Sequence, residues 1–376
     1  MRQRRSTGSG NGSIALTPDV NPAAGREHPR AFPAPPDSID AAVPWHYGDP
    51  HREQRNLQAG LGVVDLSHRG VVTVTGPDRL GWLHDLTTAS LRDLPAGASA
   101  LTLILDPRGR VEHELHLTDD GTTTWITIEP GRAPALVAYL DSMRFMLRVQ
   151  VEDVSDRFAV AWIPQRRADP QWPTILVAPE FAGVGITDAG SDRGGDASRY
   201  VPDRPGALVG AEVIVPRPQF EQYLGTRGDR AGTWALEALR VSAGVPRLGF
   251  ETDDKTLPHE VGWIGPAVHL AKGCYRGQET VARVHNLGQP PRRLVLLHLD
   301  GSVESLPAHG DQVLAGDRVV GYVGTAARHF ELGPIATAVV KRSVPVDAVL
   351  AVRCASDGTR VAAAQQAVVT GSPRRG

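Results

Sequence analysis

The most reactive side chain in this sequence is a cysteine in an unusual setting. Cys274 is one of two cysteines in 376 residues, and it lies in the stretch Lys272-Gly273-Cys274-Tyr275-Arg276-Gly277-Gln278-Glu279. The thiolate is the nucleophilic form of cysteine, and cationic neighbours favour it. Glycine permits backbone conformations that other residues avoid, including a close approach to a ligand. The stretch therefore predicts a shaped loop that presents a reactive thiol.

A structural interpretation stands beside the reactive one. Free cysteine is often a small buried hydrophobic residue. Charged and glycine neighbours favour a functional role for Cys274 over a packed core strand. The second cysteine, Cys354, follows a predicted strand without a second ligand-like residue nearby, and we interpret it as structural.

Strands and helices alternate through the first part of the chain. A β-branched run at 71–75 predicts a strand, and Gly76-Pro77-Asp78 precedes a predicted helix. Residues 100–105 and 111–117, joined by the turn Asp106-Pro107-Arg108-Gly109, predict a hairpin. Further strands are predicted at 123–129, 147–151, 158–163 and 174–178, and helices at 132–143 and 217–224. This mixture indicates α+β layers.

The second strand of the hairpin separates apolar from acidic side chains by simple alternation. One predicted face holds Val111, His113, Leu115 and Leu117, and the other holds Glu112, Glu114 and His116. A histidine among apolar residues is more often a hydrogen-bonded core residue than a ligand. The core interpretation is therefore favoured for His113, and the ligand interpretation stays open.

A predicted helix that Thr233 caps and that ends near Gly244 carries Glu237 and Arg240 on one face. If that pair is exposed, it contributes little to stability. The connector at 244–260 follows and is dense in charged residues, so it is either a solvent loop or the wall of a polar site. Its composition favours the loop, whereas its position shortly before Cys274 favours the site.

The pattern changes in the last part of the chain. Short β-rich runs separated by Gly, Pro and Asp indicate a small all-β barrel or sandwich. These runs lie at 293–299, 312–314, 318–324, 335–341 and 348–353.

Before the cysteine stretch, residues 266–271 predict one helical turn.

Composition narrows the classes of function. The net charge of −2 gives no overall electrostatic case for binding nucleic acid or a membrane. Two cysteines make no disulfide framework, which fits a reducing cytoplasm. The sequence lacks an apolar run of the ~20 residues that a membrane span needs. Neither Cys-x-x-Cys nor paired histidines at metal spacing occur, so we predict no complete metal site.

Polar segments lie at both ends of the chain and in one internal stretch. Residues 1–36 contain scarcely any large apolar side chain, which predicts a disordered tail. An RNA-binding arm or a transit peptide is the alternative for its arginines. Residues 372–376 are interpreted as disordered too, and 190–206 as a mobile loop.

The cysteine stretch resembles the signature of a known family. It is similar to the Lys-Gly-Cys-Tyr-x-Gly-Gln-Glu motif of the YgfZ family of folate-binding proteins at every specified position. That family is related to the glycine-cleavage T-protein, an aminomethyltransferase, within the GcvT superfamily. Other matching segments are Leu239-Arg240-Val241-Ser242-Ala243-Gly244, Pro246-Arg247 with Gly249, and Pro258-x-Glu260. The resemblance extends from about Asp65 into the C-terminal part.

The resemblance implies an α+β, three-domain cloverleaf around a central folate cavity, with a C-terminal β-barrel. The expected division is a disordered tail at 1–40, a folate-binding α+β domain whose first part is 41–155 and whose second part is 156–289, a barrel at 290–365 and a tail at 366–376. The second part carries the cysteine stretch.

One departure separates this chain from T-proteins. They carry Asn-x-x-Gly-Gly-x-x-Asp-Asp-Leu in the hairpin, and an aspartate there is central to aminomethyl transfer. Here the two aspartates are replaced by His113 and Glu114. Glutamate keeps the charge but displaces it by a methylene, and a displacement of ~1 Å can cost ~100-fold in rate. This departure and the cysteine stretch argue against glycine cleavage.

The resemblance therefore implies a factor that uses tetrahydrofolate or a derivative to support the assembly or repair of iron–sulfur proteins, and through them tRNA modification. Its partners would be a reduced folate and iron–sulfur proteins or their assembly machinery. Whether it is an enzyme stays open. The alternatives are a folate-dependent one-carbon transferase that uses Glu114 as its base, and a non-enzymatic folate-sensing adaptor.

The resemblance also assigns roles to individual residues. Cys274 and Lys272 would carry the chemistry, with the thiolate at the mouth of the folate cavity. Arg240, Glu260 and Glu114 would bind the folate. The residues expected to order the loop are Tyr275, Gly277, Gln278, Glu279 and Arg283.

Overall fold

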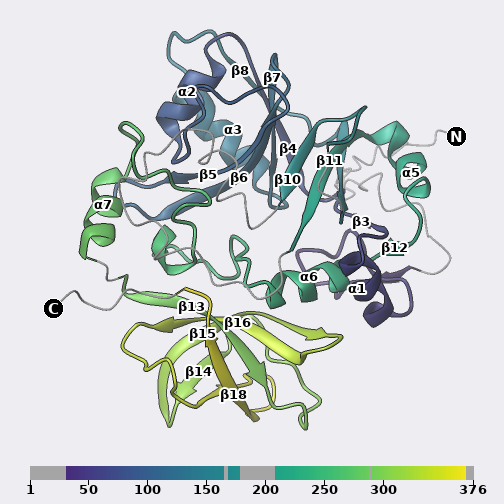
Figure 1. Ribbon diagram of the computed structural model, residues 1–376, viewed down its shortest axis with the longest axis vertical. Helices are drawn as coiled ribbons and strands as arrows, with labels where there is room; N and C mark the ends of the chain where they lie inside the picture. The colour runs from purple at the N-terminus through teal and green to yellow at the C-terminus, as the bar shows by residue number, and fades with distance from the viewer. Residues whose placement is uncertain (1–30, 165–167, 178–207, 288–289, 370–376) are drawn as a thin grey trace, which may run out of the picture.

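The computed structural model describes residues 31–164, 168–177, 208–287 and 290–369 (Figure 1). The predicted loop at 190–206, the end of the chain at 372–376 and most of the predicted N-terminal tail lie outside these ranges. Within them, every helix is too short or too polar to cross a lipid bilayer.

The first five-stranded sheet is antiparallel, and two helices pack on it. Its strand order is β5-β6-β7-β4-β8. The strands are β4 (Gly70–Thr75), β5 (Ser99–Leu105), β6 (Val111–Asp119), β7 (Thr123–Ile128) and β8 (Gln150–Asp153), and the helices are α2 (Arg79–Leu86) and α3 (Ala133–Ser142). Leu83 of α2 and Leu136 of α3 share a buried cluster with Ile126 of β7. Apolar residues on one side of the helices therefore fix them to the sheet.

The second sheet has the order β10-β11-β9-β3-β12, in which β3 and β12 are parallel. Its strands are β3 (Val63–Asp65), β9 (Phe158–Ile163), β10 (Thr174–Val177), β11 (Gly210–Pro216) and β12 (Arg230–Ala231). Three helices accompany it in sequence: α1 (Pro50–Gln58), α5 (Arg217–Gly225) and α6 (Thr233–Ser242). A short hairpin of β1 (Phe32–Pro33) and β2 (Pro44–His46) precedes α1.

The C-terminal part is a closed barrel with the strand order β13-β16-β15-β14-β17-β18. Its strands are β13 (Arg292–Leu299), β14 (Gln312–Ala315), β15 (Arg318–His329), β16 (Gly333–Lys341), β17 (Leu350–Arg353) and β18 (Arg360–Ala367). The predicted α+β fold with a C-terminal β-barrel is confirmed. The sequence prediction missed β18, which extends past residue 365. Cys354 is buried in the barrel core, as expected of a structural cysteine.

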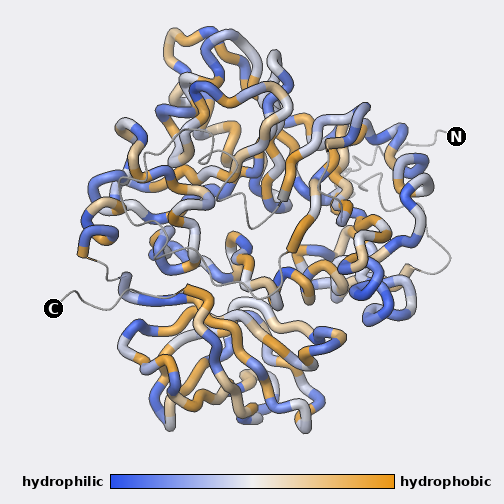
Figure 2. The backbone as a smooth tube through the Cα atoms, in the orientation of Figure 1, coloured by the Kyte–Doolittle hydropathy of each residue, from blue (hydrophilic) through white to orange (hydrophobic). Residues whose placement is uncertain are grey.

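The helix α6 lies at the junction between the barrel and the two sheets (Figure 1). Gln54 of α1 is fully buried and spans the same junction. Its amide donates to Arg328 O at 2.9 Å and accepts from Phe330 N at 2.9 Å. Figure 2 shows hydrophobic stretches along the barrel strands and hydrophilic tips on many of the turns.

A bulge in the hairpin corrects the predicted faces of β6. Leu105 pairs with Val111, but Ile104 pairs with His113, so Glu112 is an extra residue on its strand. A bulge of this kind interrupts the alternation of side chains. Val111 consequently packs in the same cluster as Leu105, whereas Leu115 and Leu117 pack on the other side with α2 and α3.

Three smaller predictions were wrong. Gly232, not Thr233, is the N-cap of α6, and the Thr233 hydroxyl donates to Pro44 O at 3.4 Å. Residues 266–271 form turns and a β-bridge rather than a helical turn. The last two residues of the cysteine motif are not loop, because α7 (Gln278–Leu287) begins at Gln278.

Candidate functional site

A cavity lies where the two sheets, α6 and the connector at 244–260 meet. Two tryptophans, Trp162 and Trp263, and several aliphatic side chains supply its apolar wall. Its ionisable lining residues are Asp40, His68, Arg69, Glu114, His116, Glu129, Glu212, Glu237, Arg240 and Arg247. Ligand sites in proteins are commonly concave and apolar with a few polar groups. This one is unusual because its charged residues form a continuous network.

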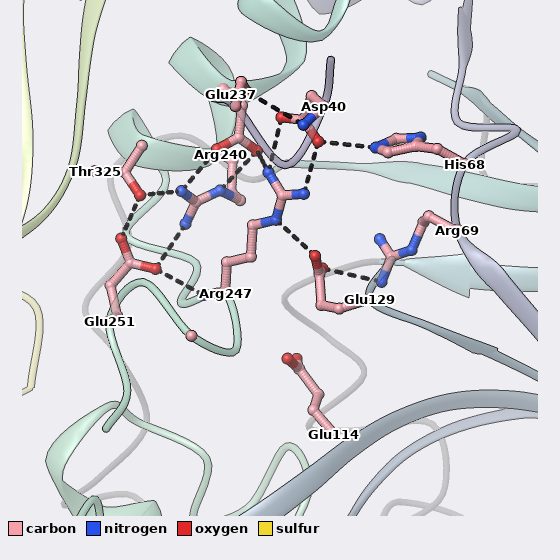
Figure 3. A network of polar contacts seen from close by, with 12 residues as sticks. Asp40, His68, Arg69, Glu114, Glu129, Glu237, Arg240, Arg247, Glu251 and Thr325 are labelled. Atoms are coloured by element: carbon pink, nitrogen blue, oxygen red, sulfur yellow. Dashed lines mark hydrogen bonds and ion pairs between the residues drawn. The ribbon is translucent and has the colours of Figure 1, made fainter. Parts of the chain in front are cut away.

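Two arginines lie at the centre of that network (Figure 3). Arg69 bonds Glu129 at 3.3 Å and Glu212 at 3.0 Å. Arg247 bonds Glu129 through Nε at 2.9 Å and Asp40 through both terminal nitrogens at 2.8 and 3.1 Å. Glu129 therefore bridges the two guanidinium groups. A buried charge is tolerated only when it is paired and hydrogen-bonded. Each charged residue of this network is paired with another residue of the network.

Arg240 extends the network toward the barrel. Its guanidinium bonds Glu237 at 2.9 Å, Glu251 at 3.1 Å and the hydroxyl of Thr325 on β15. The predicted pairing of Glu237 with Arg240 is therefore correct, but the pair is buried rather than exposed. Arg240 lines the cavity, and its own hydrogen bonds are directed to protein groups. Its role in folate binding stays a prediction.

Burial and ion pairing oppose each other in setting the ionisation of Glu212. Burial by itself raises the pKa of this carboxyl group, but Arg69 and His116 outweigh that effect and lower the pKa to about 2. The Glu212 carboxylate also accepts a hydrogen bond from Thr127. Glu212 is thus a permanent anion in the wall of the cavity.

His116 lies between two carboxylates. Its Nδ1 is 3.2 Å from Glu212 Oε1, and its Nε2 is 3.4 Å from Glu114 Oε1. Burial alone lowers the pKa of the imidazole, but Glu212 and Glu114 raise it to about 9. Near neutral pH the ring is therefore an imidazolium that donates to both acids.

Glu114 differs from the other acids of the cavity. Among the contacts between described residues, its carboxylate meets only His116, at the long distance of 3.4 Å, and no arginine. Figure 3 shows its carboxylate separate from the arginine-centred contacts. Glu114 is 8% exposed and therefore buried. Because its carboxylate has only this one long contact, it still has unused capacity to accept hydrogen bonds.

The connector at 244–260 is a wall of the site and not the solvent loop that its composition favoured. Glu251, His259 and Glu260 are fully buried, and Arg247 reaches the centre of the cavity. Glu260 does not line the cavity. It binds Arg292 of β13 at 2.7 Å and accepts from Leu257 N, so it fixes the connector to the barrel.

The cysteine motif packs against the first sheet and its helices. Lys272 is 7% exposed, and its ammonium donates to the carbonyls of His84 and Thr87 at the end of α2. A cation at a helix C-terminus is favourable because of the helix dipole. Burial lowers the pKa of Lys272 to about 8. The Lys272 ammonium is thus held by helix carbonyls.

The remaining motif residues have distinct surroundings. The Tyr275 ring is buried, and the Lys272 ammonium lies over it, 5.2 Å from the ring centroid. Gln278 Nε2 donates to Lys272 O at 3.3 Å and closes the loop. Glu279 and Arg283 form an exposed pair at 3.9 Å on α7. Cys274 itself is exposed, and it is not among the residues that line the cavity.

Gly277 and Gly109 bring the motif into contact with the hairpin turn. Both have positive φ, +82° and +77°. A Cβ on Gly277 would lie 2.6 Å from Asp106 O and 2.8 Å from Gly109 Cα. Only glycine allows two backbones to approach this closely. Arg276 adds an ion pair with Glu112 of β6 at 3.2 Å.

Of the ten ionisable residues that line the cavity, only Glu114 and Arg240 were predicted to bind the folate. The prediction missed the other eight: Asp40, His68, Arg69, His116, Glu129, Glu212, Glu237 and Arg247. The alternation of β6 did place His116 beside Glu114, which was a usable signal. Asp40 fell at the limit of the predicted tail, and its sequence context gave no indication of burial. No group of three or more His, Cys, Asp or Glu side chains in the described ranges is arranged to hold a metal ion.

Comparisons with known proteins agree with this architecture. Residues 17–164 match the GCVT N-terminal domain family. The aminomethyltransferase of Streptomyces avermitilis is 26% identical over 326 residues, which cover 79% of this chain and 83% of that protein. A chloroplastic protein of Arabidopsis thaliana named as a transferase is 25% identical over 295 residues, 73% of this chain and 65% of its own length. The chain thus spans just under two thirds of the Arabidopsis protein.

A solved structure shares the fold. The glycine cleavage system aminomethyltransferase T from Bartonella henselae superposes with a TM-score of 0.69 at 18% identity, over 90% of this chain and 94% of that one. Together these findings support a place in the GcvT superfamily. The narrower resemblance to the YgfZ family and the cytoplasmic location stay predictions.

The two glycines of the cysteine motif give a matched test of its packing. We expect Gly277→Ala to lower the free energy of unfolding by about 1–3 kcal/mol, because the new Cβ meets backbone atoms at a positive φ. Gly273→Ala is the control, since nothing lies within 4 Å of its Cβ position. We expect that variant to stay within about 0.5 kcal/mol of the original protein. Urea unfolding of both variants measures the difference, and equal midpoints would contradict the packing described.

The ionisation of His116 predicts a pH-dependent contribution to stability. Its pKa is raised from 6.5 to about 9, so its pairing stabilises the fold fully below pH 6.5 and is lost as pH rises through about 9. The stability difference between the original protein and His116→Gln should therefore shrink, on the order of 1–3 kcal/mol, over that interval. Urea unfolding at several pH values measures it, with exposed His51→Gln as a control. A difference that grows with pH would show that His116 is neutral.

Proposed function

We propose that the central cavity binds a reduced folate and that the chain catalyses a one-carbon transfer of the aminomethyltransferase kind. The single observation that carries this proposal is Glu114, a buried cavity carboxylate with unused acceptor capacity beside the His116 imidazolium. Relatives named aminomethyltransferase, aligned over most of this chain, support the same class of reaction. This was the alternative, not the main interpretation, drawn from the sequence.

The residues of the cavity fit a pterin ring. Such a ring carries N–H donors, a carbonyl acceptor and two flat faces. Carboxylates are acceptors for N–H groups, and Glu114 has unused capacity of that kind. Arg69 Nε is a buried donor without a partner among the described residues, which suits a carbonyl oxygen. Trp162 and Trp263 supply flat apolar surface in the same wall.

Glu114 and His116 are suited to moving a proton. Transfer of an aminomethyl carbon to a folate nitrogen removes a proton from that nitrogen and gives one to the leaving group. In this proposal Glu114 accepts the first proton and then passes a proton to the leaving group, while His116 stays protonated and holds Glu114 in place. Glutamate replaces an aspartate of T-proteins here, so the reacting groups must lie about one methylene further from the strand for Glu114 to reach them.

The test separates binding from transfer. We expect Glu114→Gln to keep tetrahydrofolate affinity within about tenfold, because the amide still accepts a hydrogen bond. We expect it to reduce transfer by about 10²–10⁴-fold, because the amide does not take up a proton. Calorimetric titration measures the affinity. Release of tetrahydrofolate from methylenetetrahydrofolate, with ammonia and dithiothreitol as acceptors, measures the transfer in reverse.

Glu152→Gln is the matched control, since Glu152 is half-exposed on β8 and pairs with Arg157 away from the cavity. It should bind and react like the original protein. Failure of the original protein to bind tetrahydrofolate would reject the folate site. Binding with equal turnover of Glu114→Gln and the original protein would reject the role of Glu114.

Support of iron–sulfur proteins is a second candidate, and one observation favours it. Cys274 is exposed at the surface on a loop that Gln278 and Gly277 hold in place, so a partner protein can reach the thiol. If this role is correct, Cys274→Ala should bind tetrahydrofolate normally and fail to restore iron–sulfur enzyme activity in a deletion strain. Full restoration would reject the role of the cysteine. Folate binding without transfer and without any effect of Cys274→Ala would favour the adaptor interpretation.

A further inference from the structure

The N-terminal segment before α1 contributes a wall to the central cavity. Residues 35–43, here called the lid loop, connect β1 to β2. Most of the loop is exposed, and the inward side chains of this region are Ala34, Asp40 and Val43, which are 5%, 4% and 4% exposed. Asp40 is the member of the lid loop that lines the cavity. The loop is therefore thin, with solvent on one side and the ligand site on the other.

The lid loop has few attachments to the rest of the protein. Its backbone hydrogen bonds are local: Ser38 N donates to Pro35 O, Ala41 N to Ser38 O and Val43 N to Asp40 O. Among the contacts between described residues, every hydrogen bond from the loop to the rest of the protein runs through the carboxylate of Asp40. That carboxylate accepts from both terminal nitrogens of Arg247 and is 2.8 Å from His68 Nε2.

The two ends of the segment are bound to each other and, through β2, to α6. Phe32 of β1 stacks on His46 of β2 with ring centroids 4.5 Å apart. Trp45 stacks on Trp234 of α6 at 5.8 Å. A loop fixed at both ends and attached in its middle by one side chain can open locally without unfolding the domain. The ends then act as hinges, and the attachment decides when the loop opens.

We propose that residues 35–43 are a lid over the central cavity and that Asp40 is its latch, which must leave Arg247 and His68 before a ligand enters. In the closed state, Asp40 occupies the face of Arg247 that an incoming carboxylate or carbonyl oxygen would use. The latch is charged rather than apolar, so an anionic group of a ligand can take its place without leaving Arg247 unpaired. This inference rests on the proposed folate site for the identity of the ligand, but the opening of the loop does not depend on it.

Hydrogen exchange tests the lid without any ligand. We expect Asp40→Asn to speed exchange of the loop amides at Ser38, Ala41 and Val43 by about tenfold or more, because the amide loses the charged contacts with Arg247. Asp37→Asn is the matched control, since Asp37 is exposed in the same loop. It should change exchange less than about twofold. Equal exchange in both variants would overturn the latch.

The original protein provides a measurement that does not require a stable variant. If the loop is a lid, its amides exchange by local opening, faster than the amides of the buried strand β9. Exchange of both regions at the same rate, through global unfolding only, would overturn the proposal even if Asp40→Asn does not fold.

Binding kinetics then connect the lid to the ligand. With tetrahydrofolate in stopped-flow experiments, a lid predicts that Asp40→Asn raises both the association and the dissociation rate relative to Asp37→Asn. A change confined to the dissociation rate would show that Asp40 is only a binding contact and would overturn the lid. If the original protein and both variants fail to bind tetrahydrofolate while the loop still opens faster in Asp40→Asn, the proposed function fails and the lid stands.

Discussion

The bridge of Glu129 between Arg69 and Arg247 is the interaction on which the rest of this structure depends. Three charged side chains are removed from water at the centre of the molecule, and each is tolerable only while the others stay in place. Their partners come from the lid loop, β11 and α6, so the same contacts hold several parts of the chain together. Loss of one partner would leave a buried charge unpaired, which costs far more than an exposed ion pair contributes.

This network also explains why the cavity is polar without being open. Arg240 and Glu251 carry it to Thr325 and Thr337 of the barrel, so the barrel is attached to the cavity wall by charged hydrogen bonds. The arginines use most of the hydrogen-bond acceptor capacity of the cavity acids that they pair with. Among the described residues, the carboxylate of Glu114 pairs with no arginine, so most of its acceptor capacity is unused. The geometry thus separates residues that maintain the cavity from the one acid best able to react in it.

Local patterns in the sequence predicted most of the strands and helices, but they did not predict the site. Alternation and turn residues found the hairpin because its partners are neighbours in sequence. The pairing of Asp40 with Arg247 spans 207 positions, and no local pattern reports such a contact. The charged connector was favoured as a solvent loop for the same reason, since the groups that neutralise it lie elsewhere in the chain. The bulge at Glu112 likewise moved Val111 to the opposite face, because alternation assumes an uninterrupted strand.

The strand β6 relates the cysteine motif to the cavity, although Cys274 does not line it. Glu112 binds Arg276 of the motif, and Glu114, two residues further along, faces His116 in the cavity. Gly277 packs against the turn that begins the same strand, so the motif contacts the hairpin that carries Glu114. A displacement of the motif by a partner protein would therefore act on the strand that carries Glu114. This arrangement gives a physical reason for an exposed cysteine loop and a buried carboxylate to occur in one protein, whichever of them carries the chemistry.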